Sequence, residues 1–327
     1  MVRRFKEEHK IEHKVDSFPE TWTTSEISPQ WGRLAIVTGG ASGVGYESAL
    51  ALAAAGADVI IADVDEAQAH WAVGRIRSIA PAALVRFERV DLSDFRSIGG
   101  FVEKLLRLKT PVDLLINSAG IVATGRRHLN SAGIEMQFAV NYLGPFALSG
   151  MLFPLLAASS KPRVVQVSSI SHKLGSIHFD DLQMERGYSG WKAQYQSRLA
   201  QVLFTRELAR RSRGQGWPIM AVAAHPDFAR KGIIANALSS MTLFNLLHKR
   251  LGPHYSHEAE QGALPILYAA VSPDVQAGGL YGPTGEGLGF SEVSGGPTTY
   301  PNEAESEMAQ LLWERSEELT GVKWPRG

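Results

Sequence analysis

The stretch Thr38-Gly-Gly-Ala-Ser-Gly-Val-Gly45 decides how this chain folds. It follows the apolar, β-branched run 33–37, which is typical of a buried strand. It precedes an Ala- and Leu-rich segment that closes at Gly56, a composition that predicts a helix and its end. A strand that turns through glycines into a helix directs free backbone N–H groups and the positive end of the helix dipole toward one point. Such a turn binds phosphate, and the alternative is a purely structural turn.

The second predicted strand, residues 57–62, ends at Asp63. An acidic residue at this place accepts hydrogen bonds from the adenosine ribose of a dinucleotide. Its carboxylate would repel the extra phosphate of NADP. Ser42 occupies the loop position where a basic residue would favour NADP, and serine carries no positive charge. We therefore expect NAD as the cofactor. The alternative is that Asp63 only caps the helix that begins near Asp65.

Composition removes several classes of protein from consideration. The chain has 327 residues, of which 44% are hydrophobic and 20% charged, enough to bury a full core. Lys+Arg and Asp+Glu both count 33, so no basic excess points to nucleic acid or an anionic membrane. With no cysteine there is no thiolate nucleophile and no cysteine-based metal site, and we predict no metal. We expect no membrane span and no secretory signal, which makes a cytoplasmic location the default.

Short apolar runs alternate with amphipathic stretches from residue 33 onward. The expected strands are 33–38, 57–62, 83–90, 112–116, 163–168 and 218–224, and the expected helices are 43–55, 65–79, 94–108, 130–158 and 191–213. This alternation predicts an α/β protein with a single Rossmann-type, doubly wound parallel sheet flanked by helices. Ligands of such sheets bind at the carboxyl ends of the strands, so residues that follow each strand are the candidates for a site.

Around this sheet we expect three parts. Residues 1–31 form an N-terminal extension that reads as a strap or a disordered tail, and its His9-Lys-Ile-Glu-His13 match to a zinc-protease pattern is accidental. Residues 32–290 form the NAD-binding domain, in which the apolar segment 231–260 covers the substrate. Residues 291–327 form a C-terminal helical extension.

An ordered series of motifs carries a family resemblance. The series is Thr38-Gly-x-x-x-Gly-x-Gly45, Asp63, Asp91-Leu, Asn117-Ser-Ala-Gly120, Asn141 and Val167-Ser-Ser169. It resembles the short-chain dehydrogenase/reductase family over about 33–289, and most of all its retinol-dehydrogenase-like branch. The resemblance implies an oxidoreductase that acts on a small-molecule substrate. It also implies that the protein is a homodimer or homotetramer without a nucleic-acid or membrane partner.

The resemblance also implies a role for each matching position. The glycines of the turn would face the pyrophosphate, Asp91 the adenine amino group and Leu92 the adenine ring, while Asn117 and Gly120 would line the cofactor cleft. The implied cofactor-binding set is Thr38, Gly39, Ser42, Gly43, Val44, Gly45, Asp63, Val64, Asp91, Leu92, Asn117, Ala119, Gly120 and Pro226. Asn141 would hold a water in a proton relay, and Ser169 would bond the substrate oxygen. Helix packing for Asn141 and a strand-end cap for Ser169 are the alternatives.

The family's catalytic pair is where the sequence departs from the pattern. The family uses a tyrosine acid and, four residues later, a lysine that lowers its pKa. The run Ser197-x-Leu-Ala fixes the register and puts Gln194 at the tyrosine position and Arg198 at the lysine position. Glutamine cannot donate a proton as an acid, and arginine does not share the geometry of lysine.

Two tyrosines could replace the missing acid. Tyr195 adjoins Gln194, but its side chain points about 100° away on a regular helix unless the helix shifts locally. Tyr188 and Lys192 also spell Y-x-x-x-K, although Gly190 disfavours a helix there. The third alternative is a site without a tyrosine acid.

A second departure follows the sixth predicted strand. Asp227 follows Pro226 where the family has glycine, and Lys231 stands near the position of a threonine. We expect His225 to pack at the strand end, and His172 is a weaker candidate acid. The adenosine half of the site is thus intact by sequence, whereas the nicotinamide half is altered. The sequence favours an NAD-dependent oxidoreductase that acts on an alcohol/carbonyl pair in an apolar or aromatic small molecule and uses Ser169, Asn141 and an atypical catalytic acid. The alternative is a non-redox (lyase or isomerase) or inactive NAD-binding relative.

Overall fold

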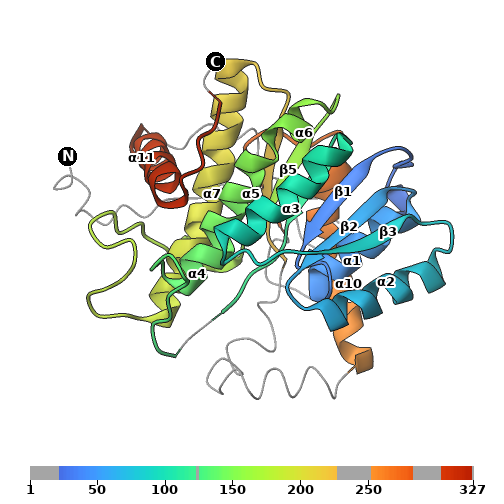
Figure 1. The fold of residues 1–327 in the computed structure, drawn as a ribbon, viewed down its shortest axis with the longest axis horizontal. Helices are drawn as coiled ribbons and strands as arrows, with labels where there is room; N and C mark the ends of the chain where they lie inside the picture. Colours follow the sequence, from blue (N-terminus) through green and yellow to red (C-terminus); the bar gives the residue numbers. More distant parts are fainter. Residues whose placement is uncertain (1–21, 123–124, 227–251, 283–302, 326–327) are drawn as a thin grey trace.

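The computed structural model describes residues 22–122, 125–226, 252–282 and 303–325. Seven strands in these ranges form one sheet in the order β3-β2-β1-β4-β5-β6-β7 (Figure 1). All the neighbouring strands are parallel, which confirms the predicted doubly wound sheet. The strands are β1 (Leu34–Thr38), β2 (Asp58–Asp63), β3 (Val85–Arg89), β4 (Leu114–Asn117), β5 (Arg163–Val167), β6 (Met220–Ala224) and β7 (Leu280–Tyr281).

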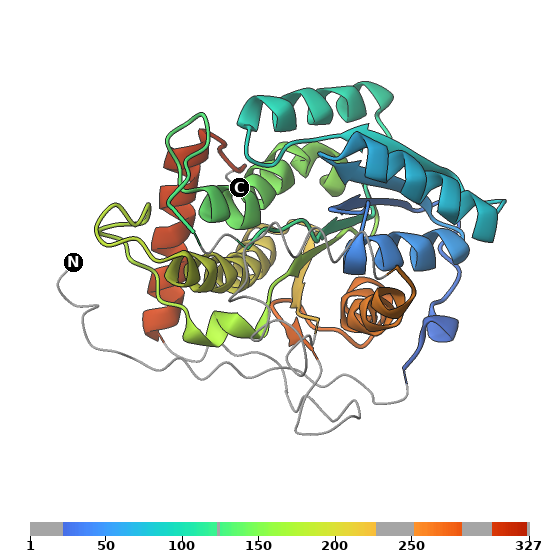
Figure 2. The same cartoon turned by 90° about the horizontal axis from the view of Figure 1, so that it is seen from below.

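Helices cover both faces of the sheet and enclose two apolar cores (Figures 1 and 2). The helices on one face are α1 (Gly43–Ala54), α2 (Glu66–Ile79) and α10 (Gly252–Val271). Those on the other face are α3 (Phe95–Leu108), α4 (Met136–Phe138), α5 (Gly144–Met151), α6 (Phe153–Ala157) and α7 (Gly190–Gln215), with α11 (Glu303–Thr320) packed outside α7. The sheet is therefore buried on both sides, as its near-continuous apolar strands require.

Local signals in the sequence explain where several helices begin and end. The Asp65 carboxylate accepts the Gln68 N–H at 3.0 Å and caps the start of α2. Ser189 caps α7 in the same way, and Gly216 ends that helix in the left-handed conformation at φ +68°. These caps make the observed helix bounds close to the predicted ones.

The structure differs from the single helix predicted over 130–158. It begins only at Met136, passes through a π-helical turn at Ala139–Leu143, and breaks between α5 and α6. Pro145 and Pro154 stand in the first turns of α5 and α6, where the missing N–H group costs least. π-helical turns of this kind are frequent at functional sites.

Residues 22–31 pack against the body of the protein. The Trp22 ring meets Tyr268 of α10 edge to face at 5.6 Å, and the Gln30 N–H donates to the Ala55 carbonyl at 2.8 Å. This part of the N-terminal extension is therefore a strap over α1 and α10. The His9–His13 pattern lies outside the described residues.

The described part of segment 231–260 is the start of α10, which packs beside α1. The prediction that this segment covers the substrate otherwise concerns residues 231–251, which lie outside the described ranges. Among the helices described, none is long and apolar enough to cross a membrane.

Candidate active site

The glycine-rich turn after β1 is shaped by close backbone approach. A Cβ at Gly45 would lie 2.3 Å from the Gly39 carbonyl oxygen, and one at Gly39 would lie 2.7 Å from Ala119 Cα. Gly39 and Gly43 adopt φ +65° and +54°, which favour glycine. A Cβ at Gly43 would meet nothing within 4 Å, so the turn is open at that point.

Helix α1 begins at this turn. Ser42 precedes the helix, is exposed, and makes no capping hydrogen bond through its side chain. The partly exposed Val44 follows in the first helical turn. The first N–H groups of a helix have no partner within the helix, and they are the groups that bind phosphate. The turn therefore leaves the start of α1 open to a ligand, and phosphate binding there stays a prediction.

Asp63 lies at the end of β2 beside the same turn. One carboxylate oxygen accepts the Ala41 N–H at 3.1 Å, and the other accepts the N–H groups of Val64 at 2.8 Å and Asp65 at 3.1 Å. Val64 is exposed. Asp63 thus holds the glycine turn to the end of β2, and its capping alternative is wrong because Asp65 itself caps α2.

Three of the predicted cofactor residues serve the scaffold through their side chains. The Leu92 side chain is 5% exposed and belongs to the apolar core, so little of it is open to a ligand. Asn117 is fully buried and donates to the Ser149 hydroxyl at 3.2 Å, so its side chain does not line a cleft. The Thr38 hydroxyl accepts the Ala119 N–H at 3.1 Å and ties the end of β1 to the segment after β4.

Asp91 is partly buried after β3. Its Oδ1 accepts the N–H of Ser93 at 2.9 Å and the hydroxyl of the same residue at 2.6 Å, and its own N–H donates to the Ser97 hydroxyl at 3.0 Å. These contacts fix the loop between β3 and α3 at the carboxyl edge of the sheet.

Asn141 lies in the π-helical turn and clamps the chain after β4. Its Oδ1 accepts the Ile121 N–H at 2.7 Å, and its Nδ2 donates to the Ile121 carbonyl at 3.0 Å and to the Ser197 hydroxyl at 3.0 Å. Its carbonyl accepts Gln201 Nε2 at 2.7 Å. A relay water at Asn141 would have to share groups that the protein already holds.

Ser169 lies at the carboxyl end of β5. Its hydroxyl accepts the Ser171 N–H at 3.3 Å and caps the short 3-10 helix Ile170–Leu174, and its side chain remains partly exposed. The buried Ser168 hydroxyl instead donates to the Arg198 carbonyl at 2.9 Å. Ser169 is therefore the serine that can reach a ligand at this edge.

Gln194 and Arg198 lie one turn apart on α7, which is helical without interruption from Gly190 to Gln215. We assign the Gln194 amide from its neighbours: Nε2 donates to Gln137 Oε1 at 2.9 Å and to the Ile121 carbonyl at 3.1 Å. Gln194 Oε1 then accepts Arg198 Nε–H at 3.0 Å.

The Arg198 guanidinium reaches the segment after β4. Its Nη1 donates to the Val167 carbonyl at 3.2 Å and to Gln201 Oε1 at 3.3 Å. A Cβ at Gly120 would lie 2.9 Å from its Nη2, so a side chain at that position would push the guanidinium aside. Burial lowers the pKa of Arg198 to about 10, which keeps it charged at neutral pH. Within the described ranges no carboxylate pairs with this cation.

Tyr195 points away from these groups. Its ring lies 6.1 Å from that of Trp191, four residues earlier on α7, and the helix shows no shift at this position. The local rearrangement that would bring Tyr195 to the place of Gln194 is therefore not present.

Tyr188 lies before α7, at the other side of the same network. Its hydroxyl donates to Glu135 Oε1 at 3.0 Å, and burial together with the Glu135 charge raises the pKa of Tyr188 to about 12. Gly190 is the first helical residue, so the expectation that it opposes a helix there is wrong. Lys192 is exposed and Tyr188 is outside the helix, so the two do not share a helix face.

Pro226 follows β6 and is partly buried. His225 before it is buried, and its ring lies 6.2 Å from that of the buried His172. This agrees with the expected packing role of His225. Asp227 and Lys231 lie outside the described residues.

Three polar residues of the site belong to none of the family motifs. Gln137, Gln201 and Glu135 are buried and bond the predicted residues directly. The only signal is spacing: Gln137 precedes Asn141 by one helical turn, and Gln201 follows Arg198 by one.

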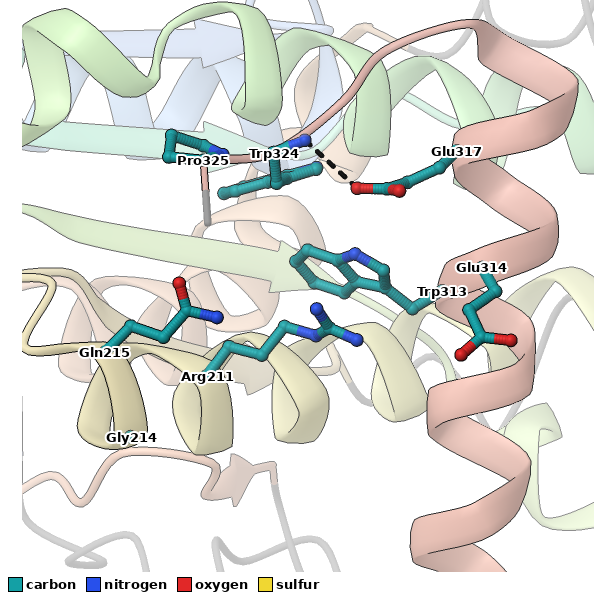
Figure 3. A pocket seen from close by; sticks show the side chains of 8 residues that line it. All are labelled: Arg211, Gly214, Gln215, Trp313, Glu314, Glu317, Trp324 and Pro325. Carbon is teal, nitrogen blue, oxygen red and sulfur yellow. Dashed lines mark hydrogen bonds between the residues drawn. The ribbon is translucent and has the colours of Figure 1, made fainter. Parts of the chain in front are cut away.

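A cavity of about 630 Å³ lies elsewhere, between the end of α7, α11 and the C-terminal residues (Figure 3). Trp313 and Trp324 line it, and the Arg211 guanidinium stacks over the Trp313 ring at 4.5 Å. Glu317 accepts the Trp324 N–H at 3.0 Å and anchors the tail. At 1.5 Å of rise per residue, Arg211 lies about 20 Å along α7 from Arg198, so this cavity is separate from the candidate active site.

Comparisons with known proteins agree with this geometry. The family model for short chain dehydrogenases matches residues 33–226. The chain is 35% identical to human Retinol dehydrogenase 12 over 90% of this chain and 88% of that protein. It is also 35% identical to human Polyprenol dehydrogenase over 90% of this chain and 87% of that protein.

Solved structures show the same fold. The crystal structure of an uncharacterised protein from Mycobacterium paratuberculosis aligns with a TM-score of 0.74 and 34% identity, over 93% of this chain and 99% of that chain. A metagenomic short-chain oxidoreductase in complex with NADP, 20% identical, aligns with a TM-score of 0.51 over 65% of this chain and 93% of that chain. With its parallel sheet and its glycine turn, the chain belongs to the short chain dehydrogenase family of oxidoreductases.

Proposed function

We propose that this protein is an NAD-dependent oxidoreductase that acts on an alcohol/carbonyl pair in an apolar or aromatic small molecule. The observation that carries the proposal is the meeting of two features at the carboxyl edge of the sheet. The glycine turn follows β1, and the Arg198 guanidinium lies against Gly120 after the adjacent β4. The strand order reverses between these two strands, and dinucleotides bind across such a point.

The residues fit a dinucleotide in shape and charge. The open space at Gly43 leaves room for a phosphate above the N-terminus of α1. The carboxylate of Asp63 stands beside the turn, where it can accept hydrogen bonds from ribose hydroxyls and repel an additional phosphate. This charge is the reason to propose NAD over NADP.

The side chains near the proposed nicotinamide position have different roles in the reaction. A bound nicotinamide would donate or accept the hydride. Ser169 would donate a hydrogen bond to the substrate oxygen, and Arg198 would stabilise negative charge that develops on it. Gln194 bonds Gln137 and Arg198 and has no acidic proton, so we propose that the proton is exchanged with solvent.

Exposed apolar side chains support an apolar substrate. Ile170 and Leu174 follow Ser169 with exposed fractions of 39% and 68%, and Trp191 precedes Gln194 with 36%. The retinol and polyprenol dehydrogenases similar to this chain are named for alcohols of apolar character. The homo-oligomeric state and the cytoplasmic location stay predictions from the sequence.

Nucleotide binding is the first test. Energy transfer from the seven tryptophans to NADH or NADPH would report binding, and we expect NADH to bind at least tenfold more tightly. Binding of neither nucleotide would refute the proposal. A preference for NADPH would refute only the choice of NAD.

Turnover is the second test. Retinal and aromatic ketones would be offered with NADH to the wild type, Ser169→Ala and Arg198→Met. We expect each substitution to lower turnover about 10- to 100-fold, and the pair Gln194→Tyr with Arg198→Lys to raise it. Tight NADH binding without turnover of any carbonyl would favour the non-redox alternative.

A further inference from the structure

We propose that Gln137 is a positioning residue of the candidate active site, which holds Arg198 in place through Gln194. The inference rests on the proposed function, because it assigns Gln137 to the cation that would face the nicotinamide half of the cofactor. Gln137 belongs to α4 and matches no motif of the family series.

Gln137 joins the start of α7 to the amide of Gln194. Its Nε2 donates to the Gly190 carbonyl at 2.8 Å, and its Oε1 accepts Gln194 Nε2 at 2.9 Å. The side chain is fully buried. An amide that donates at one end and accepts at the other has only one orientation that satisfies both partners. Gln137, together with the Ile121 carbonyl that accepts the same Nε2 at 3.1 Å, therefore fixes which way the Gln194 amide points.

The orientation of Gln194 in turn selects that of Arg198. With Nε2 held by Gln137, Gln194 presents Oε1 to Arg198 Nε at 3.0 Å. The reversed amide would accept Asn141 Nδ2–H at 3.2 Å, but it would turn its NH2 group against the Nε–H donor of Arg198 and its oxygen against the oxygens of Gln137 and Ile121. Arg198 has Nε and Nη1 fixed by Gln194, Val167 and Gln201, which leaves Nη2 turned toward Gly120.

The burial of these polar groups makes this arrangement consequential. Gln194 is 4% exposed and lies among buried groups of α4, α7 and the π-helical turn. A buried amide or cation that loses its partner keeps the full cost of desolvation, so it moves to find another. Without Gln137 we expect Gln194 to turn and the guanidinium to leave its place at Gly120.

A double-mutant cycle tests the link from Gln137 through Gln194 to Arg198, and it requires no known substrate. The variants are Gln137→Met, Arg198→Met and their combination, with affinities measured for NADH and for ADP, which contains only the adenosine half. Gln196→Met is the matched control, because Gln196 is also buried and its amide bonds only the backbone of His178 and Leu182.

We expect Arg198→Met to weaken NADH binding about tenfold, the order of one hydrogen bond to a charged group, and to leave ADP binding within about twofold. Gln137→Met should weaken NADH about fivefold with the same indifference of ADP, and the double variant should lose no more than Arg198→Met alone. Gln196→Met should lower the melting temperature as much as Gln137→Met but leave the affinity for NADH unchanged.

Unchanged NADH affinity in Gln137→Met, or losses that multiply in the double variant, would overturn the positioning role while the proposed function stands. A wild type that binds no nucleotide would overturn the proposed function instead. A crystal structure of Gln137→Met decides the geometry in either case: Arg198 Nε still within hydrogen-bond distance of Gln194 Oε1 would overturn the inference.

Discussion

Two glycines of the same turn should respond differently to alanine. A Cβ at Gly43 would meet no atom within 4 Å, so the added methyl group causes no clash. Gly43→Ala therefore loses stability only because alanine must adopt the left-handed φ of +54°. That cost is about 1–2 kcal/mol. A Cβ at Gly45 would lie 2.3 Å from the Gly39 carbonyl oxygen, and backbone must move to admit it. Overpacking of this kind costs about 1–3 kcal/mol or more.

Thermal unfolding and NADH binding separate the two effects. At about 2–4 °C per kcal/mol, Gly43→Ala should lower the melting temperature by a few degrees and Gly45→Ala by clearly more. Both should lose NADH binding by at least tenfold, since the methyl of Gly43→Ala occupies the proposed phosphate position. Gly74→Ala is the control, because Gly74 lies exposed within α2 with open space around it and alanine stabilises a helix by about 0.5–1 kcal/mol.

Two separate results would contradict these expectations. Wild-type NADH affinity in Gly43→Ala would show that the pyrophosphate does not lie at the turn. An unchanged melting temperature in Gly45→Ala would show that α1 and Gly39 do not approach as closely as the structure has them.

Three further predictions concern charge and packing. Asp63→Asn should weaken NADH and strengthen NADPH, each several-fold by titration, because the carboxylate that repels the extra phosphate is gone; unchanged selectivity would contradict this role. Trp324→Ala removes a buried ring from the aromatic cluster around Trp313, and a loss of about 3–5 kcal/mol should appear in denaturant unfolding, whereas the exposed Trp71→Ala should change little. Burial and the neighbouring Glu260 raise the pKa of Glu47 to about 7, so the folded state binds this proton more tightly than the unfolded state. The free energy of unfolding should therefore fall as pH rises from about 5 to 7, and Glu47→Gln should reduce that fall; identical pH profiles would refute the shift.

Local pattern was sufficient for the sheet. Most of the strands are short apolar runs, and α2, α3 and α7 have side-chain caps, so many of the signals lie within a few residues of the element they define. The expected strands differ from the observed ones by only one or two residues at their ends. The helix expected over 130–158 was wrong, because the π-helical turn at Ala139–Leu143 is stabilised by contacts from the segment after β4.

Side-chain direction at the strand ends needed the packed structure. Asn117 ends β4 and Ser169 follows β5, yet the amide of Asn117 turns inward to Ser149 and Ser169 stays partly exposed. Both faces of a parallel sheet are buried, so the sequence pattern does not say which side chain meets a helix. Leu92 likewise turns into the apolar core.

The amino-acid sequence by itself determined the Rossmann-type sheet, the glycine turn and the acidic end of β2, and it predicted that Gln194 and Arg198 stand where the family has tyrosine and lysine. Only the tertiary structure decided what those two residues touch. Gln137 and Arg198 are 61 residues apart in the chain and belong to different helices, so their link through Gln194 exists only once α4 packs on α7. Hydrogen bonds between buried groups depend on distances of a few tenths of an ångström, which local sequence pattern does not encode.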